Sequence, residues 1–171
     1  MNVICSLSKI GEILLKHKKI IHEQLSEALK LQSTNNKKLG EILMEKGYIS
    51  ETTLLRALSE QLNIEVVNLD NYHVNTDAVR LLSEKTAKRT CSVPLKHWED
   101  RILVAMEDPL NIFYIEDIES ETGRIAETVL ASKTQIMDSI EKYMGRRNAE
   151  KAVEDFDKEK SANEELGEAE L

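Results

Sequence analysis

Two matching sets of polar and glycine residues stand near the start of the chain, at a constant spacing from each other. The sets are Lys9, Gly11 and Gln32, followed by Lys38, Gly40 and Gln61. A lysine can bind a phosphate as a point charge, and a glutamine amide can both donate and accept hydrogen bonds. A glycine allows close approach to the backbone. This layout suits a ligand that is itself twofold, with anionic phosphates and with bases that offer hydrogen-bonding edges.

The segments that carry these residues, 9–32 and 38–61, are copies of one pattern. Aligned without a gap, they share 10 identities in 24 positions. About two identities are expected by chance at ordinary residue frequencies. A five-residue spacer, residues 33–37, joins the copies. The chain therefore contains an internal duplication.

Each copy predicts two short helices separated by a turn. In the second copy an apolar stripe ends at Gly47, a helix stop, and Ser50 can cap the next helix. The first copy has the same apolar stripe, but Lys18 replaces the helix-stop glycine and Ile21 replaces the capping serine. Helical hairpins with one apolar face must bury it against another element, so we expect a small four-helix unit. The repeat could serve this packing alone.

Helix propensity does not explain the two glycines. Gly11 and Gly40 lie close to predicted helix starts, where alanine would be more stable by up to about 1 kcal/mol. Their presence predicts close backbone approach, either by a helix or by a ligand.

These segments resemble the tandem motif in the N-terminal domain of type II secretion and type IV pilus assembly ATPases, of the MshEN type. The family pattern is R-L-G-x-x-L, a glycine, two apolar residues and L-x-x-x-L-x-x-Q, repeated after five residues. The stretch L-V-A-M-E-D-P-L-N at residues 103–111 is similar to the second subdomain of the family. The resemblance therefore covers most of the chain.

In that family the tandem motif binds cyclic di-GMP, so the resemblance implies a site for this ligand. By matching position, the two lysines take the guanine-facing place of the family arginine, and the two glutamines supply a closing polar contact. The two glycines would admit the ligand to the main chain. The implied apolar bed consists of Ile10, Leu25, Leu29, Leu39, Leu54 and Leu58.

Three departures from the family pattern keep two hypotheses open. Lysine replaces arginine in both copies, which removes the planar fork that contacts guanine O6 and N7. Ile10 replaces a leucine, and Lys18 replaces the turn glycine. The chain is either a cyclic di-GMP module that signals to a secretion, pilus or motility partner, or a protein-interaction domain that has lost nucleotide binding.

After the repeat the hydrophobic period changes and predicts an α+β unit with a mixed sheet. Predicted strands are 65–69, 91–97, 101–106 and 124–130, and predicted helices are 76–83, 84–89, 111–122 and 132–143. The fold class is therefore α+β. The predicted division is a helical subdomain at 1–62, an α+β subdomain at 63–145 and an acidic tail at 146–171. We expect the tail to be disordered, with a docking segment as the alternative.

Composition and motifs argue against several other functions. A net charge of −8 is unsuited to a general DNA or RNA binder. No G-x-x-x-x-G-K-[ST] motif occurs, so we expect no ATPase activity and no enzyme. The four histidines and Cys5 and Cys91 lack metal-ligand spacing, so we expect no metal and two free thiols. Without an apolar run of membrane-spanning length or a signal peptide, we expect a cytoplasmic protein.

Overall fold

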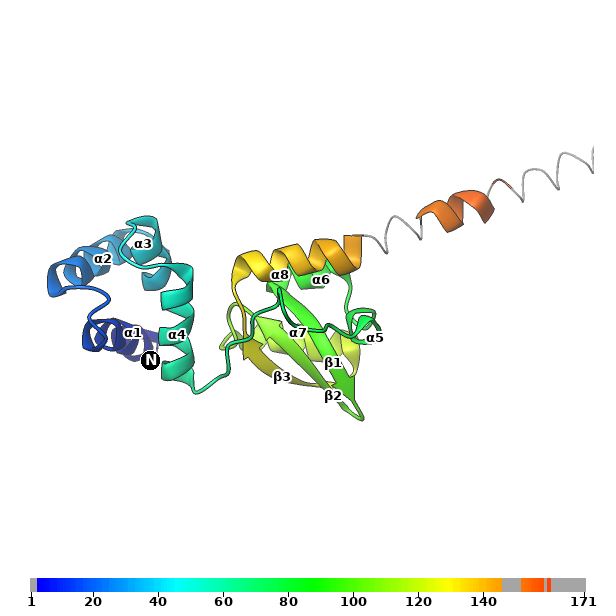
Figure 1. The fold of residues 1–171 in the computed structure, drawn as a ribbon, viewed down its shortest axis with the longest axis horizontal. Coiled ribbons are helices and arrows are strands. Elements are labelled where there is room, and N and C mark those ends of the chain that lie inside the picture. Colours follow the sequence, from blue (N-terminus) through cyan, green and yellow to red (C-terminus); the bar gives the residue numbers. More distant parts are fainter. Residues whose placement is uncertain (1–2, 146–151, 159, 161–171) are drawn as a thin grey trace, which may run out of the picture.

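The computed structural model describes residues 3–145, 152–158 and 160. Its first part is the predicted four-helix unit (Figure 1). The helices are α1 (Val3–Lys16), α2 (His22–Thr34), α3 (Leu39–Glu45) and α4 (Glu51–Leu62). Helix α1 packs on α4 and α2 packs on α3, so each repeat packs its helices against those of the other.

Equivalent residues of the two repeats are buried in the same core. The buried pairs are Ile10 and Leu39, Leu14 and Leu43, Ile20 and Ile49, and Ala28 and Ala57, none of them more than 8% exposed. Full burial of a leucine or isoleucine side chain contributes about 1.5–3 kcal/mol. The duplicated apolar stripe therefore forms the core of this unit.

The turn between the helices is the same in both repeats, although only one contains glycine. Gly47 has φ +72° and Lys18 has φ +52°, so both adopt the left-handed conformation. In each repeat the next amide donates to the carbonyl five residues earlier at 2.9 Å. Lys18 thus takes the glycine conformation instead of altering the loop.

The helix starts after these turns differ in the way that the sequence predicts. Ser50 caps α4, because its Oγ accepts from the amide of Thr53 at 3.2 Å. Ile21 cannot accept such a bond. Instead, its own amide donates to Oε1 of Gln24 at 3.0 Å.

The second part is a three-stranded sheet with helices packed against it. Its elements are α5 (Thr76–Val79), α6 (Glu84–Thr90), β1 (Ser92–Trp98), β2 (Arg101–Met106), α7 (Ile112–Thr122), β3 (Ile125–Leu130) and α8 (Lys133–Ile140), with a π-helical turn at Glu141–Gly145. The strand order is β1-β2-β3, with β1 and β2 antiparallel and β2 and β3 parallel. The predicted mixed sheet and α+β class are confirmed.

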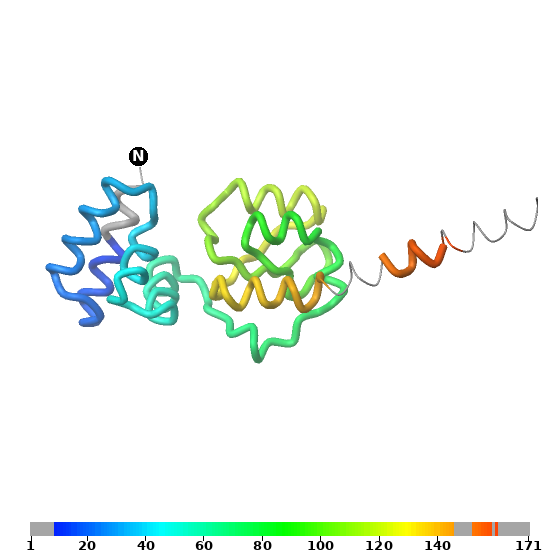
Figure 2. The backbone as a smooth tube through the Cα atoms, turned by 90° about the horizontal axis from the view of Figure 1, so that it is seen from above, coloured from blue at the N-terminus to red at the C-terminus, as the bar shows by residue number. Residues whose placement is uncertain are grey.

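Burial in β2 shows that this strand lies at the centre of the second core. Ile102, Val104, Ala105 and Met106 are each 0% exposed. The two cores are separate clusters, one in the helices and one around the sheet. Figure 2 shows the two units side by side, joined by the chain that follows α4.

Two predicted elements are shorter than expected. The predicted strand at 65–69 is only a bridge between Val66 and Leu130, which is the last residue of β3. Beyond this bridge, the amide of Leu69 donates to Oε1 of Gln135 at 3.2 Å. The predicted helix at 76–83 ends at Val79, and Asn75 caps its start.

Most of the predicted tail, residues 146–151, 159 and 161–171, lies outside the described residues. Residues 152–158 are helical with exposed side chains. Figure 1 draws this tail helix beyond α8, on the side of the sheet unit away from α1 and α2.

Candidate functional site

The residues implied for the ligand site all lie in the four-helix unit, but with different exposure. Ile10, Leu39, Gly11 and Gly40 are buried, and Leu25, Leu54 and Leu58 are half-buried. Leu29, on α2, remains 43% exposed. The implied apolar bed is therefore mainly part of the core, with Leu29 as its most open member.

Each of the two glycines makes room for a leucine of the neighbouring helix. A Cβ atom on Gly40 would lie 2.6 Å from Cδ1 of Leu54, and one on Gly11 would lie 2.8 Å from Cδ1 of Leu25. Real Cβ atoms do not approach other atoms so closely. Of the two reasons predicted for these glycines, close approach by a helix is therefore present in both repeats.

The two lysines of the repeat have different surroundings. Lys9 is exposed on α1. Lys38 immediately precedes α3, and its Nζ lies 2.7 Å from Oδ2 of Asp108, between β2 and α7. This ion pair links the four-helix unit to the sheet unit. Asp108 is not among the predicted site residues, although the D-P-L-N stretch that contains it is similar to the family.

Acidic neighbours favour the charged form of Lys38. Partial burial lowers the pKa of its ammonium, but the hydrogen bond and charge of Asp108, with Glu107 and Glu41, outweigh burial and raise the pKa overall. The side chain of Lys38 is still 60% exposed, so we expect the ion pair to contribute at most about 1 kcal/mol of stability. At neutral pH Lys38 is a cation held beside the sheet unit.

A thiol lies close to the same group of charges. Burial, together with the charge of Glu107 and a hydrogen bond to it, raises the pKa of Cys91 to about 12. Cys91 is a free cysteine, as predicted, whereas the side chain of Cys5 lies outside the described residues. The Cys91 thiol is therefore protonated at neutral pH.

The glutamines that close each copy lie near the ends of α2 and α4. Nε2 of Gln32 is 3.5 Å from the carbonyl oxygen of Lys37, a long hydrogen bond to the spacer. Gln61 is half-buried. The structure thus holds Gln32 close to the residue before Lys38, which brings the end of one copy to the start of the next.

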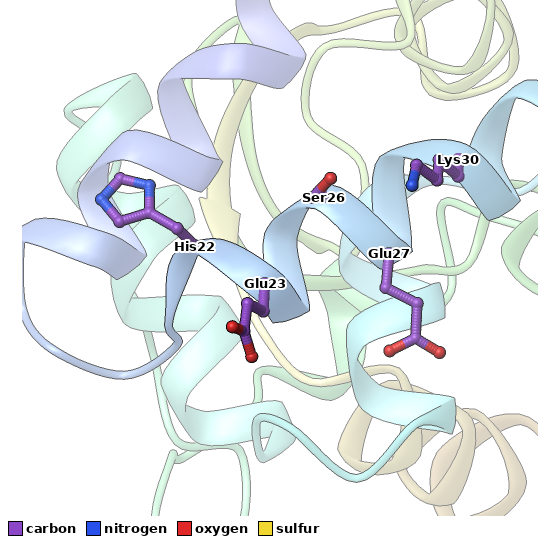
Figure 3. Close-up of a pocket in the computed structure, with 5 residues that line it drawn as sticks. All are labelled: His22, Glu23, Ser26, Glu27 and Lys30. Carbon is purple, nitrogen blue, oxygen red and sulfur yellow. The ribbon is translucent and has the colours of Figure 1, made fainter.

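A shallow depression of about 440 Å³ lies along one side of α2 (Figure 3). Its lining residues are His22, Glu23, Ser26, Glu27 and Lys30. None of them is a predicted site residue. Glu27 also accepts hydrogen bonds from Nζ of Lys46 at 2.8 Å and from the Tyr48 hydroxyl at 2.5 Å, which tie α2 to the turn after α3.

The acidic residues of α7 brace the sheet unit. Glu121 accepts hydrogen bonds from the Ser83 amide at 2.6 Å and the Thr86 hydroxyl at 2.5 Å, at the start of α6. Asp117 pairs with Arg89 at 2.5 Å. Within the described part of the chain, no group of three or more His, Cys, Asp or Glu could hold a metal ion. Nor is any described helix both long and apolar enough to cross a membrane.

Sequence comparison matches residues 62–150 to the MshEN domain. The type IV pilus assembly ATPase PilB of Myxococcus xanthus is 33% identical over 139 residues, which are 81% of this chain and 25% of PilB. Bacteriophage adsorption protein B of Escherichia coli is 26% identical over 142 residues, 83% of this chain and 19% of that protein. The chain thus spans about a quarter or less of these relatives.

Solved structures match both units of the chain. The structure of MshE with cdg is 32% identical, with a TM-score of 0.71, and the match covers 78% of this chain and 97% of that one. The N-terminal domain of XpsE shares the fold at 19% identity, with a TM-score of 0.66 and coverage of 81% and 95%. Because each match covers more of the chain than residues 62–150 supply, each extends into the four-helix unit.

Proposed function

The chain belongs to the MshEN domain family, and from that premise we propose that its four-helix unit binds cyclic di-GMP. The second unit then passes the state of the site to a protein partner in a secretion, pilus or motility system. The observation that carries this proposal is the likeness to MshE with cdg, the abbreviation of cyclic di-GMP, at 32% identity over 97% of that chain.

The proposed contacts are the residues of the family motif that the structure leaves exposed or half-buried, which are Lys9, Leu25, Leu29, Gln32, Lys38, Leu54, Leu58 and Gln61. The other four implied residues, Ile10, Gly11, Leu39 and Gly40, are buried and support the site from the core. Lys9 and Lys38 contact the guanines or the phosphates, and Gln32 and Gln61 close the site. Leu29, which is 43% exposed, offers an apolar surface for a base. The sheet unit senses a bound ligand through the Lys38–Asp108 ion pair, because a ligand that contacts Lys38 competes with Asp108 for its ammonium group. A ligand shifts such an equilibrium only by its different affinity for the two states.

A second candidate function is a protein-interaction domain that binds no nucleotide. Three observations favour it. Lysine replaces arginine in both copies, and Lys38 is already paired with Asp108. The match to the MshEN domain covers residues 62–150, which lie outside the tandem motif. The two functions differ in one measurable property, which is affinity for cyclic di-GMP.

Isothermal titration of the chain with cyclic di-GMP tests the proposal, with GTP and cyclic GMP as control ligands. We expect one ligand per chain. The double variant Lys9→Arg/Lys38→Arg should bind about tenfold tighter or more, because a bidentate arginine–guanine contact contributes about 1–3 kcal/mol of discrimination. The control variant Lys85→Arg/Lys133→Arg, with both changes in the sheet unit, should bind like the native chain.

Loss of a site residue should act in the opposite direction. Gln32→Ala removes one polar contact and should weaken binding, whereas Ser26→Ala on the same helix should not. Absence of heat at millimolar ligand for both the native chain and the double arginine variant would reject the ligand proposal. The protein-interaction function would then stand.

A further inference from the structure

The turn between α1 and α2 has diverged from its counterpart in the second repeat. Residues 16–22, which we call the basic turn, read K-H-K-K-I-I-H, whereas the equivalent residues 45–51 read E-K-G-Y-I-S-E. The basic turn keeps the left-handed conformation at Lys18, φ +52°, without the glycine that suits it. A basic side chain thus occupies a position where glycine would be less strained.

The basic turn presents cations around an exposed apolar residue. Lys18 and Lys19 are exposed, and neither forms an ion pair with a described residue. Lys16 and His17 share the carboxylate of Glu60, at 3.4 and 2.7 Å. Ile21 is 58% exposed. In a chain with a net charge of −8, this turn is a local basic surface with an apolar centre.

The tail helix, residues 152–158, has the complementary character. Val153 and Phe156 are 61% and 70% exposed, and their spacing of three places them on one face. Glu154 and Asp155 lie between them in the sequence and are also exposed. The tail helix therefore offers an apolar pair beside carboxylates, and the basic turn offers an apolar isoleucine beside lysines. The two surfaces are complementary in charge, and each has an apolar centre.

We propose that the basic turn of one copy binds the tail helix of a second copy. Figure 1 places the two elements at opposite ends of the molecule, so a contact between copies joins them without bending the chain back. Contact between different surfaces of identical chains is head-to-tail, and it can extend into open or closed assemblies. This inference is independent of the nucleotide ligand.

The depression along α2 extends the match. It begins at His22, the last residue of the basic turn, and continues past Glu23 to Lys30 (Figure 3). The described tail ends in Lys158 and Lys160. If Glu154 and Asp155 of the tail helix contact the basic turn, and the helix lies along α2, then Lys158 and Lys160 approach Glu23. The orientation of the helix follows from this alternation of charge.

Sedimentation velocity of the full chain, from micromolar to millimolar concentration, tests the proposal. We expect the average mass to rise with concentration at low salt and to fall at high salt, because screening weakens exposed charge contacts. Lys18→Glu/Lys19→Glu breaks the turn surface, and Val153→Ser/Phe156→Ser breaks the tail surface. Each should weaken association at least tenfold, whereas Lys85→Glu/Lys133→Glu, with the same change in net charge, should not.

The most specific test mixes the turn variant, Lys18→Glu/Lys19→Glu, with the tail variant, Val153→Ser/Phe156→Ser. One variant keeps an intact tail and the other an intact turn, so the mixture should form dimers and nothing larger, although each variant alone stays monomeric. Circular dichroism establishes that each variant is folded. A native chain that stays monomeric, or association unaffected by either variant, overturns the proposal. If the monomer instead binds phosphatidylglycerol vesicles through Lys18 and Lys19, the basic turn is a lipid-binding surface and the proposal is likewise overturned.

Discussion

Lys18 shows how a single residue can retain a structure that its type disfavours. Its left-handed conformation, φ +52°, is stabilised by the same turn hydrogen bonds that surround Gly47 in the other repeat. For a residue with a Cβ atom this conformation costs roughly 1–2 kcal/mol. The surrounding helices therefore impose the turn, and the lysine retains the strain.

Replacing Lys18 by glycine should stabilise the chain by up to about 1 kcal/mol. The gain from removing the strain exceeds the entropy that glycine adds to the unfolded state, about 0.5–1 kcal/mol. Urea unfolding measures the change. Lys19→Gly, at the next position, where φ is not positive, should destabilise the chain. A Lys18→Gly variant as unstable as Lys19→Gly would show that the turn carries no strain.

The contact of Lys38 marks the limit of sequence reasoning at the scale of residues. Lys38 belongs to the repeat and Asp108 to the D-P-L-N stretch of the sheet unit, and the two residues are 70 positions apart in the sequence. Neither helical periodicity nor local spacing carries information about such a distant pair. The charge partner of a site residue therefore had to come from the three-dimensional arrangement.

At the scale of elements, the contact between helices of one repeat depends on a glycine and a leucine. Gly11 faces Leu25 and Gly40 faces Leu54, in the same way in each copy. The sequence predicted that these glycines permit close approach, but it left the approaching group open. Only the packing shows that the leucine side chain fills the space.

Gly40→Ala should therefore destabilise the four-helix unit by about 1–3 kcal/mol, the usual cost of overpacking. Helix propensity alone predicts the opposite sign, a gain of up to about 1 kcal/mol. The new Cβ would lie 2.6 Å from Cδ1 of Leu54, so Leu54 has to move. The control, Ser26→Ala on exposed α2, should be neutral or slightly stabilising. Equal or higher stability of Gly40→Ala in thermal unfolding would refute the packing role.

Elements with strong local signals agree with the prediction, whereas the short segment at 65–69 does not. The predicted strand at 101–106 and the predicted helix at 111–122 are both present, as Arg101–Met106 and Ile112–Thr122. The predicted strand at 65–69 has the right composition, but it meets β3 only at Leu130, where that strand ends, and the amide of Leu69 donates to Gln135. A side-chain acceptor from α8 cannot be recognised in the local pattern of residues 65–69.

At the scale of the whole molecule, the described residues form two separate cores, and the links between the two units include a chain segment and the Lys38–Asp108 ion pair. Each unit can therefore lose its packing without exposing the core of the other. The single tryptophan, Trp98, lies in β1 and reports on the sheet unit. Far-UV circular dichroism is dominated by helices and includes the four-helix unit.

Unfolding followed by Trp98 fluorescence and by circular dichroism should therefore give different midpoints. Gly40→Ala should lower the circular dichroism midpoint and leave the Trp98 midpoint almost unchanged, because the substitution affects only the first core. Asp108→Ala, which removes the Lys38–Asp108 ion pair, should change both midpoints little, as expected for an exposed ion pair. Coincident transitions for the native chain and for both variants would mean that the two cores unfold as one cooperative unit.

The Lys38–Asp108 contact also breaks the symmetry that the duplication creates. Lys38 of the second repeat is paired with the sheet unit, whereas its counterpart Lys9, on α1, forms no ion pair with a described residue. A molecule with two identical halves, held between the repeats, would therefore meet two unlike environments. Its halves would become distinguishable, with separate resonances in a magnetic resonance spectrum and stepwise affinities for fragments of half its size. An internal duplication can in this way yield a receptor with a defined direction.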